Sequence, residues 1–337
     1  MAHARPLIVY YEHPDWFRPL FHELDRREVS YRKIDAARHR FDPASAGPAG
    51  ETSLFFNRMS PSAWKRGRAG AIFQTRDLLG HLEALGIPCF NGYEAFVLET
   101  SKALQVSLLE RLGLPVPRTR VVGHTGVLAE AARELEFPLV VKPNIGGSGA
   151  GIERFDDAES LERAVESGSI FAGVDGVLLL QEYHSPRDGS IVRIETLQGG
   201  YLYAIRVHMG ESAGFDLCPA DICRTVDGSS LESAACPAGA AKAGLTVERF
   251  TPPGWLLEGA LTIAREARLD VGGIEYLESE RDGRSYFYDV NALSNFVADP
   301  VRVVGLDPTA RLVDALLERA GAAVGPGAET VAAGRRP

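Results

Sequence analysis

Short apolar runs and amphipathic segments alternate over the first hundred residues, and this pattern predicts a small α/β unit. The apolar runs 6–11, 29–34 and 53–57 are too short for helices and have the character of buried strands. Segments 15–27 and 72–85 show helical periodicity instead. Because a strand–helix–strand order builds parallel sheets, we expect these strands to form one parallel sheet.

The chain between residues 101 and 168 is predicted to contain two helices and two strands. The first helix covers 101–112, with Thr100 as its N-cap. Strands at 139–142 and 152–155 flank a glycine-rich segment. The second helix begins at a capping-box-like pair and ends at a glycine, and these three residues are Asp156, Glu159 and Gly168.

The remaining chain is predicted to be mostly strands with two long helices. The expected strands are 177–182, 190–196, 201–208, 274–278 and 285–290. Helical periodicity predicts the helices 255–268 and 308–320. Residues 211–251 show no clear period, so no element is predicted there.

These elements predict three units and a tail. We expect an N-terminal α/β domain at 1–98, a central subdomain with a glycine-rich flap at 99–185, and a C-terminal subdomain at 186–325. Residues 326–337 are predicted to be a disordered tail. A length of 337 residues allows two or three packed subdomains.

Composition and charge exclude several classes of protein. Hydrophobic residues make up 45% of the chain and charged residues 24%, as in soluble globular proteins. The net charge is −9 with both signs interspersed, so we expect no non-specific binding to nucleic acid or anionic membranes. The chain has neither an apolar run long enough to span a membrane nor an apolar leader, which favours a cytoplasmic protein. Its four irregularly spaced cysteines favour reduced thiols.

A glycine-rich loop follows the strand at 139–142. Glycine allows positive φ and close approach, so successive backbone N–H groups in such a loop can surround phosphate oxygens. Lys142 precedes the loop and could place an ammonium near such phosphates. Neither the Walker A pattern nor G-x-G-x-x-G is present, and a plain turn is the alternative.

Lys102 lies in the first turn of its predicted helix. A cation there opposes the helix dipole at a cost of a few tenths of a kcal/mol. The placement is consistent with a ligand-facing role, although by itself it is explained as well by a surface lysine.

The predicted hairpin near residue 282 carries a candidate magnesium site. Asp289 and Asn291 lie two apart on one strand and therefore face one side, and Mg²⁺ prefers carboxylate and other hard oxygen ligands. Glu275 can join them only if it lies opposite Asp289. A two-residue turn at 282–283 would turn Glu275 away, whereas a three-residue loop at 281–283, with Gly283 at positive φ, pairs the two carboxylates. We predict the three-residue loop; the alternative is a solvated hairpin with scattered acids.

The order of these parts resembles the ATP-grasp superfamily and, within it, the RimK-like amino-acid ligases. The resemblance covers about residues 53–320 and rests on Lys102, Lys142 with the glycine loop, the segment 178–183, Gly273-Ile274-Glu275 and Tyr288-Asp289-Val290-Asn291. Segments 56–60 and 89–92 also resemble the family. The implied fold is α/β (α+β): an N-terminal parallel-sheet domain, a small central lid domain and a C-terminal antiparallel sheet.

The resemblance implies roles for individual residues. The implied nucleotide-binding residues are Lys102, Lys142, Gly146, Gly147, Ser148, Gly149, Gly151, Glu182, Tyr183, Asp188 and Arg193. Within this set the glycines form a flap over the β- and γ-phosphates, and the backbone of Glu182 and Tyr183 meets the adenine. The implied metal ligands are Glu275, Asp289 and Asn291. Arg206, acting with Lys142, is implied to contact the phosphate that is transferred.

Three positions depart from the family pattern. Ile191 stands where an acidic residue commonly binds ribose, so Asp188 or Glu195 would have to take that role. Asp289 replaces the usual glutamate at the central metal position. The segment 292–296 lacks the common Pro-Gly, so the acceptor side of the pocket is expected to differ.

The resemblance implies a ligase that uses ATP to join a carboxylate to an amine through an acyl phosphate. ATP and Mg²⁺ are the implied cofactors, with one or two metal ions that Mn²⁺ could replace. Amino acids or a peptide are the implied substrates, and a homo-oligomer is compatible with this assignment. A kinase acting on a small molecule and a nucleotide-binding regulatory module without turnover are the alternatives.

The residues that would bind these substrates are candidates only. Those that could bind a carboxylate or a polar group are Asn57, Arg58, Arg193, Arg224, Ser294 and Asn295. A zinc site could be assembled from His208, Cys218, Asp221 and Cys223. Because the spacing of these four matches no zinc motif, we expect buried thiols instead.

Overall fold

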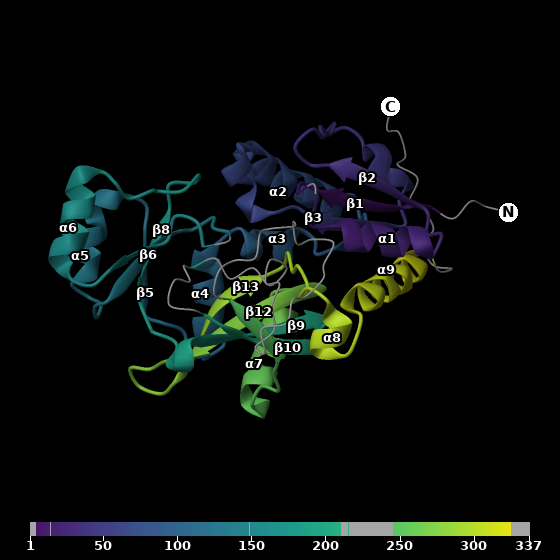
Figure 1. Cartoon of the computed structure of the whole chain (residues 1–337). Helices are drawn as coiled ribbons and strands as arrows, with labels where there is room; N and C mark the ends of the chain where they lie inside the picture. Colours follow the sequence, from purple (N-terminus) through teal and green to yellow (C-terminus); the bar gives the residue numbers. More distant parts are fainter. Residues whose placement is uncertain (1–4, 14, 148, 210–214, 216–244, 325–337) are drawn as a thin grey trace.

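Three β-sheets organise the chain in a computed structural model that describes residues 5–13, 15–147, 149–209, 215 and 245–324. In Figure 1 the N-terminal sheet lies above a five-stranded sheet, and the third sheet forms a lobe to one side of both. The helix α4 (Lys102–Arg111) lies between the lobe and the other two sheets. The site described below lies where these parts meet.

The N-terminal sheet is parallel, as predicted, in the order β2-β1-β3-β4. Its strands are β1 (Leu7–Tyr11), β2 (Tyr31–Asp35), β3 (Leu54–Arg58) and β4 (Cys89–Phe90). Alternate residues of β1 enter different cores, because side chains of a strand alternate between faces. Leu7 and Val9 pack with α1 (Arg18–Arg26), whereas Ile8 and Tyr10 pack with α2 (Ala69–Ala84).

The final helix returns to this N-terminal sheet. Helix α9 (Pro308–Val324) packs its residues Leu312, Val313 and Leu316 into the core that contains α1. Figure 1 shows α9 beside α1, and Val271 of β12 (Val271–Glu278) joins the same core. The C-terminal part of the chain is thereby tied to the N-terminal domain.

The side lobe is an antiparallel sheet covered by helices. Its strands, in the order β5-β8-β6-β7, are β5 (Thr119–Val122), β8 (Leu178–Glu182), β6 (Leu139–Pro143) and β7 (Glu153–Phe155). Helices α5 (Leu128–Ala132) and α6 (Ala158–Ser167) supply one core with this sheet. Helix α6 is capped by Asp157, whose carboxylate accepts a hydrogen bond from Ser160 N at 2.8 Å, and not by the predicted Asp156.

The five-stranded sheet is antiparallel in the order β11-β10-β9-β12-β13. Its strands are β9 (Ser190–Leu197), β10 (Gly200–His208), β11 (Thr246–Arg249), β12 (Val271–Glu278) and β13 (Ser285–Asn291). Helix α7 (Gly254–Glu266) covers one face through Leu256, Ala260 and Ile263. The other face borders the cavity of the candidate site.

The sequence pattern did not reveal several short elements. These are α3 (Tyr93–Glu99), α5, β5, α8 (Pro300–Val304) and the 3₁₀ segments η1 (Gly47–Glu51), η2 (Pro61–Arg66), η3 (Thr125–Val127) and η4 (Arg187–Gly189). Helix α4 is capped by Ser101, whose hydroxyl accepts from Leu104 N at 3.2 Å, rather than by Thr100. Strand β11 falls inside the segment 211–251, most of which, like the predicted tail, lies outside the described residues.

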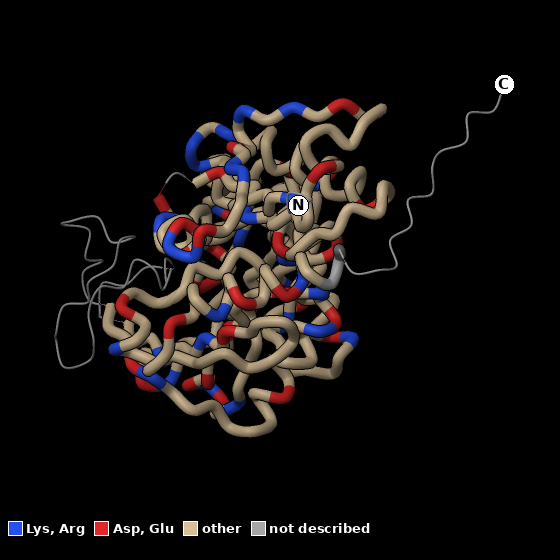
Figure 2. Tube along the Cα trace, turned by 90° about the vertical axis from the view of Figure 1, so that its right-hand side faces the viewer, with Lys and Arg blue, Asp and Glu red and all other residues tan. Residues whose placement is uncertain are grey.

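Acidic and basic residues are interspersed over the molecule, as the sequence indicated. Figure 2 shows both signs mixed along the trace from the N-terminal sheet to the five-stranded sheet. Among the helices that the structure describes, none combines the length and apolarity needed to cross a membrane.

Candidate active site

A cavity of about 560 Å³ lies where the side lobe, the five-stranded sheet and the segment η2 meet. Residues of β6, β8, β9, β12 and β13 line it, together with α4 and the glycine-rich loop. The predicted site residues that border it are Lys102, Lys142, Gly146, Gly147, Gly149, Glu182, Tyr183, Arg193, Glu275, Asp289, Asn291 and Asn295. Folding thus gathers in one cavity residues that are up to 193 positions apart in the sequence.

The hairpin places Glu275 opposite Asp289, which confirms the predicted pairing. The loop that closes the hairpin differs from the prediction, since Ser279 N donates to Arg284 O and four residues, 280–283, connect the strands. That loop alone would pair Asp289 with Ile274 and turn it to the face covered by α7. A β-bulge at Tyr288 inserts one extra residue and restores the pairing. Gly283 has φ 69°, the positive value that was expected.

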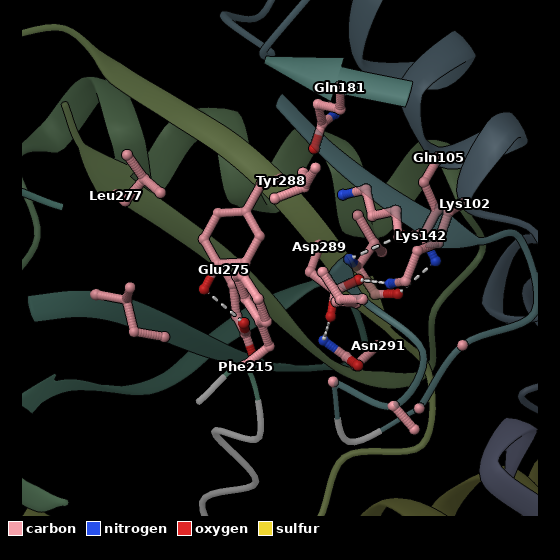
Figure 3. Close-up of a pocket in the computed structure, with 18 of the residues that line it drawn as sticks. Lys102, Gln105, Lys142, Gln181, Phe215, Glu275, Leu277, Tyr288, Asp289 and Asn291 are labelled. Atoms are coloured by element: carbon pink, nitrogen blue, oxygen red, sulfur yellow. Dashed lines mark hydrogen bonds and ion pairs between the residues drawn. The ribbon is translucent and has the colours of Figure 1, made fainter. Parts of the chain in front are cut away.

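Asp289 is held between a lysine and an amide. Its Oδ1 accepts a hydrogen bond from Lys102 Nζ, and its Oδ2 accepts one from Asn291 Nδ2 at 3.2 Å. Figure 3 shows Lys102 of α4 and Asn291 of β13 both reaching Asp289. Burial acts to raise the pKa of Asp289, but the Lys102 ammonium outweighs it and holds that pKa below its ordinary value. The carboxylate is therefore charged at neutral pH.

Glu275 also has two partners. Its Oε1 accepts from Arg193 Nη1 at 2.7 Å, and its Oε2 accepts from the Tyr288 hydroxyl at 2.8 Å, a contact visible in Figure 3. Arg193 in turn donates from Nε to Glu195 at 2.6 Å. Arg193, predicted to bind a ligand, borders the cavity but is already engaged in a buried ion-pair network with Glu195 and Glu275.

Lys142 lies on β6 without such support. It is 6% exposed and forms no ion pair with any described residue. Burial lowers the pKa of Lys142 to about 7, and the nearby Lys102 ammonium contributes to that shift. An anionic ligand in the cavity would supply the counter-charge that this lysine lacks.

The glycine-rich loop rests against the N-terminal domain. Gly147 has φ 147°, and a Cβ there would lie 2.6 Å from Ser62 Cβ. At Gly146 a Cβ would lie 3.0 Å from Lys102 Cε. Gly147 therefore needs the close approach that only glycine allows, whereas a side chain at Gly146 would require the end of Lys102 to shift. Gly151 does not border the cavity, and Ser148 lies outside the described residues.

The predicted hinge, Glu182 and Tyr183, borders the cavity, and the backbone N–H and C=O of Tyr183 already form hydrogen bonds within the protein. Tyr183 N donates to Pro138 O at 2.8 Å, and Tyr183 O accepts from Arg281 Nη2 at 3.2 Å. The Glu182 carboxylate accepts from Arg118 Nη1 at 3.2 Å and so belongs to the side lobe.

Two predicted nucleotide contacts are placed elsewhere. Arg206 pairs with Val192 on the face covered by α7, and its guanidinium lies 4.0 Å from the centre of the Phe250 ring. The prediction that Arg206 contacts the transferred phosphate is therefore wrong. Asp188 is exposed in the turn before β9 and does not border the cavity, and Glu195 is fully buried beside Arg193, so neither is placed to bind ribose.

Of the described substrate candidates, Asn295 borders the cavity, whereas Ser294 and Arg58 do not. The Oδ1 of Asn295 has no hydrogen-bond partner among the described residues. Ser294 is fully buried, with its hydroxyl donating to Glu195. Arg58 lies beneath this segment, donates from Nη2 to Ser294 O at 2.6 Å, and has a pKa lowered to about 10 by burial.

The remaining candidates concern the alternative zinc site and Arg224. Arg224, Cys218, Asp221 and Cys223 lie outside the described residues. His208, the fourth member of the proposed zinc set, has its Nε2 2.9 Å from Glu248 Oε1.

Gly273 is a site residue whose role the sequence did not reveal. A Cβ at this position would lie 2.3 Å from Arg193 Nη2 and 2.5 Å from Arg193 Cζ. The guanidinium therefore crosses the strand at the one place where β12 has no side chain on that face. The need for glycine at position 273 is visible only in the folded sheet, where β9 and β12 are neighbours.

Replacing Gly273 with alanine is expected to lower the free energy of unfolding by about 3 kcal/mol, the cost of breaking a buried ion pair. The new methyl group would displace Arg193 and separate it from Glu275. Urea denaturation measures the effect. Gly70→Ala is the control, since a Cβ there meets nothing within 4 Å. Equal midpoints for wild type and Gly273→Ala would contradict the prediction.

The donor set fits a hard divalent cation bound together with a phosphate ligand. Glu275, Asp289 and Asn291 present carboxylate and amide oxygens on one face of the hairpin, the ligand types that Mg²⁺ takes. Within the described part of the chain, no three His, Cys, Asp or Glu side chains are arranged to hold a metal on their own. Mg²⁺ commonly uses only one or two carboxylates and completes its shell with phosphate oxygens and water.

Curated proteins similar to this chain match part of it. A segment is 32% identical over 122 residues to a D-alanine–D-alanine ligase of Pseudomonas putida strain GB-1, covering 36% of this chain and 36% of that ligase. Another alignment, 32% identical over 139 residues, is with the N-terminal section of the carbamoyl phosphate synthase large chain of Methanopyrus kandleri, covering 38% of this chain and 24% of that protein. The chain thus spans about a third or less of the length of these two relatives. No family model matches the chain.

Solved structures match nearly all of the chain. The ATP-grasp ligase PsnB complexed with a minimal precursor has a TM-score of 0.64 at 19% identity and covers 94% of this chain and 99% of its own. The RimK domain ATP-grasp protein of Sphaerobacter thermophilus has a TM-score of 0.65 at 18% identity, with 92% and 98% covered. The D-alanine–D-alanine ligase of Bacillus anthracis complexed with ATP has a TM-score of 0.64 at 15% identity, with 94% and 97% covered.

The parallel N-terminal sheet, the side lobe and the five-stranded antiparallel sheet around one cavity are therefore the ATP-grasp fold. The fold that the sequence resemblance implied is thereby confirmed.

Proposed function

We propose that this protein is an ATP-dependent ligase of the RimK-like type, which joins a carboxylate to an amine through an acyl phosphate. The observation that carries the proposal is the meeting of two buried lysines with the Glu275–Asp289–Asn291 face in one cavity. The relatives support it, since both the curated D-alanine–D-alanine ligase and the solved structures named above carry ligase or ATP-grasp descriptions. An amino acid or a peptide is the substrate class that these names favour.

The residues have distinct tasks in this proposal. Lys102 and Lys142 would neutralise phosphate oxygens, and Glu275, Asp289 and Asn291 would hold Mg²⁺. When bound, Mg-ATP supplies the γ-phosphoryl group that turns a carboxylate into an acyl phosphate, because oxide is too poor a leaving group for an amine to displace. The glycine loop on Ser62 would exclude water from that reactive group. The chain's contribution is alignment and charge neutralisation rather than covalent chemistry.

An ADP-release screen over paired carboxylates and amines, with mass spectrometry of the products, tests the proposal. The expected result is ADP together with a product whose mass equals the two substrates less one water. A stable phosphorylated product would identify a kinase instead. ATP binding without ADP release across the panel would identify a nucleotide-binding module.

ATP binding at pH 8 is expected to take up a proton at Lys142. In the free protein this lysine has a pKa of about 7 and is mostly neutral at pH 8, and phosphate charges would raise that pKa. Affinity for ATP should therefore be highest below pH 7, where Lys142 is already protonated. It should fall by up to about tenfold per pH unit as pH rises above 7. Calorimetry in two buffers of different ionisation enthalpy measures the uptake.

Lys142→Met is the control for this titration, since it removes the titrating group. Its ATP-binding heats should agree in the two buffers. Equal heats in the wild type would contradict the prediction.

A further inference from the structure

Glu99 differs from the other carboxylates of the cavity. Four acidic side chains border it, and three form ion pairs: Glu182 with Arg118, Glu275 with Arg193 and Asp289 with Lys102. Glu99 forms no ion pair with any residue that the structure describes, although it is only 8% exposed. A buried carboxylate is costly unless a cation or several donors compensate it.

The protein supplies Glu99 with backbone donors and no salt-bridge partner. It is the last residue of α3, and its Oε2 accepts a hydrogen bond from Ala292 N. Of the two cations near Glu99, Lys102 pairs with Asp289, and Arg58 donates from Nη2 to the carbonyl of Ser294 without forming an ion pair with Glu99. Burial raises the pKa of Glu99 to about 7, because it disfavours the charged form of a carboxylate that has no ion-pair partner among the described residues.

A second acceptor borders the same cavity. Asn295 is 8% exposed, and its Oδ1 has no hydrogen-bond partner among the described residues. Asn295 comes three residues after Ala292, whose N–H donates to Glu99, so Glu99 of α3 and Asn295 after β13 line the same cavity. Two acceptors, one of them anionic, match a ligand group with several N–H donors and a positive charge.

The cavity is also lined by Trp16, Ser60, Pro61, Ser62 and Leu293. Ser60 and Ser62 already share a hydrogen bond of 2.7 Å between their hydroxyls.

We propose that Glu99 binds the amine substrate as its ammonium ion, with the Asn295 amide oxygen accepting a second N–H. This inference rests on the proposed ligase function and adds the chemical class of its second substrate: a primary amine that is protonated at neutral pH, as in an amino acid or a lysine-like side chain. It excludes hydroxyl and thiol nucleophiles.

The proton balance assigns a second task to Glu99. The bound ammonium must lose one proton to the Glu99 carboxylate before its nitrogen lone pair can attack. Attack on the acyl carbon forms the C–N bond and breaks the C–O bond, and phosphate leaves with that electron pair. The nitrogen then loses its second proton to solvent, giving a neutral amide.

Competition between a charged and an uncharged nucleophile tests the proposal. Hydroxylamine is largely uncharged at neutral pH and converts an acyl phosphate into a hydroxamate without needing an ammonium site. The enzyme is given ATP, the carboxylate found in the ADP-release screen, hydroxylamine, and in turn each protein amino acid as the amine. In Glu99→Gln the ratio of amide to hydroxamate is expected to fall about 30-fold, as for loss of a charge-assisted hydrogen bond. Both parameters should change, with a higher KM for the amine and a lower kcat for amide formation, because Glu99 binds the ammonium and accepts its proton.

Glu94→Gln is the matched control. Glu94 lies on the same helix, but it is exposed and paired with Arg268 on the outer surface, so its variant should keep the wild-type ratio. Gln at position 99 retains an oxygen that can accept from Ala292 N, which favours correct folding. Circular dichroism and a melting curve check this.

Each outcome has a distinct meaning. An amide-to-hydroxamate ratio in Glu99→Gln equal to that of wild type overturns the inference. If the wild type forms no hydroxamate with any carboxylate, the proposed function itself fails, and the inference with it. Should Glu99→Gln unfold, wild-type enzyme answers the question: the free amine should inhibit hydroxamate formation and its N-acetyl derivative should not, whereas equal inhibition by both overturns the inference.

Discussion

Asp289→Asn is expected to lower substrate-dependent ADP release at least about 1000-fold while the protein stays folded. Such a fall corresponds to about 4 kcal/mol of lost transition-state stabilisation. The reason is electrostatic: Asp289 is a charged carboxylate on the face shared with Glu275 and Asn291, and an amide cannot replace its charge toward a divalent cation. An asparagine oxygen can still accept from Lys102, so the fold should persist.

The measurement is ADP release with the substrate pair found by screening, alongside far-UV circular dichroism. Asp282→Asn is the control, since Asp282 is exposed at the tip of the same hairpin. The metal assignment is contradicted if Asp289→Asn turns over within tenfold of wild type.

Lys102→Met and Lys142→Met are expected to change stability in different ways. Lys102 and Asp289 form an ion pair whose side chains are 17% and 20% exposed. Removing Lys102 leaves Asp289 beside Glu275 without its cation, at an expected cost of about 2–3 kcal/mol in unfolding free energy, the lower side of what buried pairs show. Lys142 has no carboxylate partner and a lowered pKa, so Lys142→Met should be neutral or stabilising without nucleotide.

Magnesium provides a test that does not depend on activity. If Glu275, Asp289 and Asn291 hold Mg²⁺, the ion should restore much of the stability lost in Lys102→Met, because it replaces the missing positive charge. Urea denaturation with EDTA and with millimolar Mg²⁺ compares the variants. The assignment fails if Mg²⁺ stabilises Lys102→Met no more than wild type, or if Lys142→Met is the less stable variant.

The candidate site residues that line the cavity as expected from the sequence are those on a single strand or loop. Lys142, the glycine loop and the pair Asp289 and Asn291 meet in the cavity as expected. Their relation is local, because two residues two apart on a strand share a face and a loop follows its own strand. Of Glu99 and Asn295, only Asn295 was a candidate from the sequence. Glu99 was not, because its lack of an ion-pair partner among the described residues can be seen only in the folded structure.

The sequence by itself determined the longer elements and their order, the parallel N-terminal sheet, and the residue types that a phosphate and a metal require. The tertiary structure decided which side chains face the cavity, and two β-bulges were decisive. Counting from the turn at 198–199, Arg206 would pair with Ile191 on the cavity face, but an irregularity between Tyr201 and Tyr203 moves it opposite Val192. At Tyr288 the second bulge does the reverse and turns Asp289 toward Glu275.

The physical reason is that side chains along a strand alternate with a period of two. One inserted residue therefore exchanges the two faces for everything beyond it, and whether it is inserted depends on packing against neighbouring strands. The periodicity of the sequence gives the two faces. Only the folded sheet decides which of them forms the site.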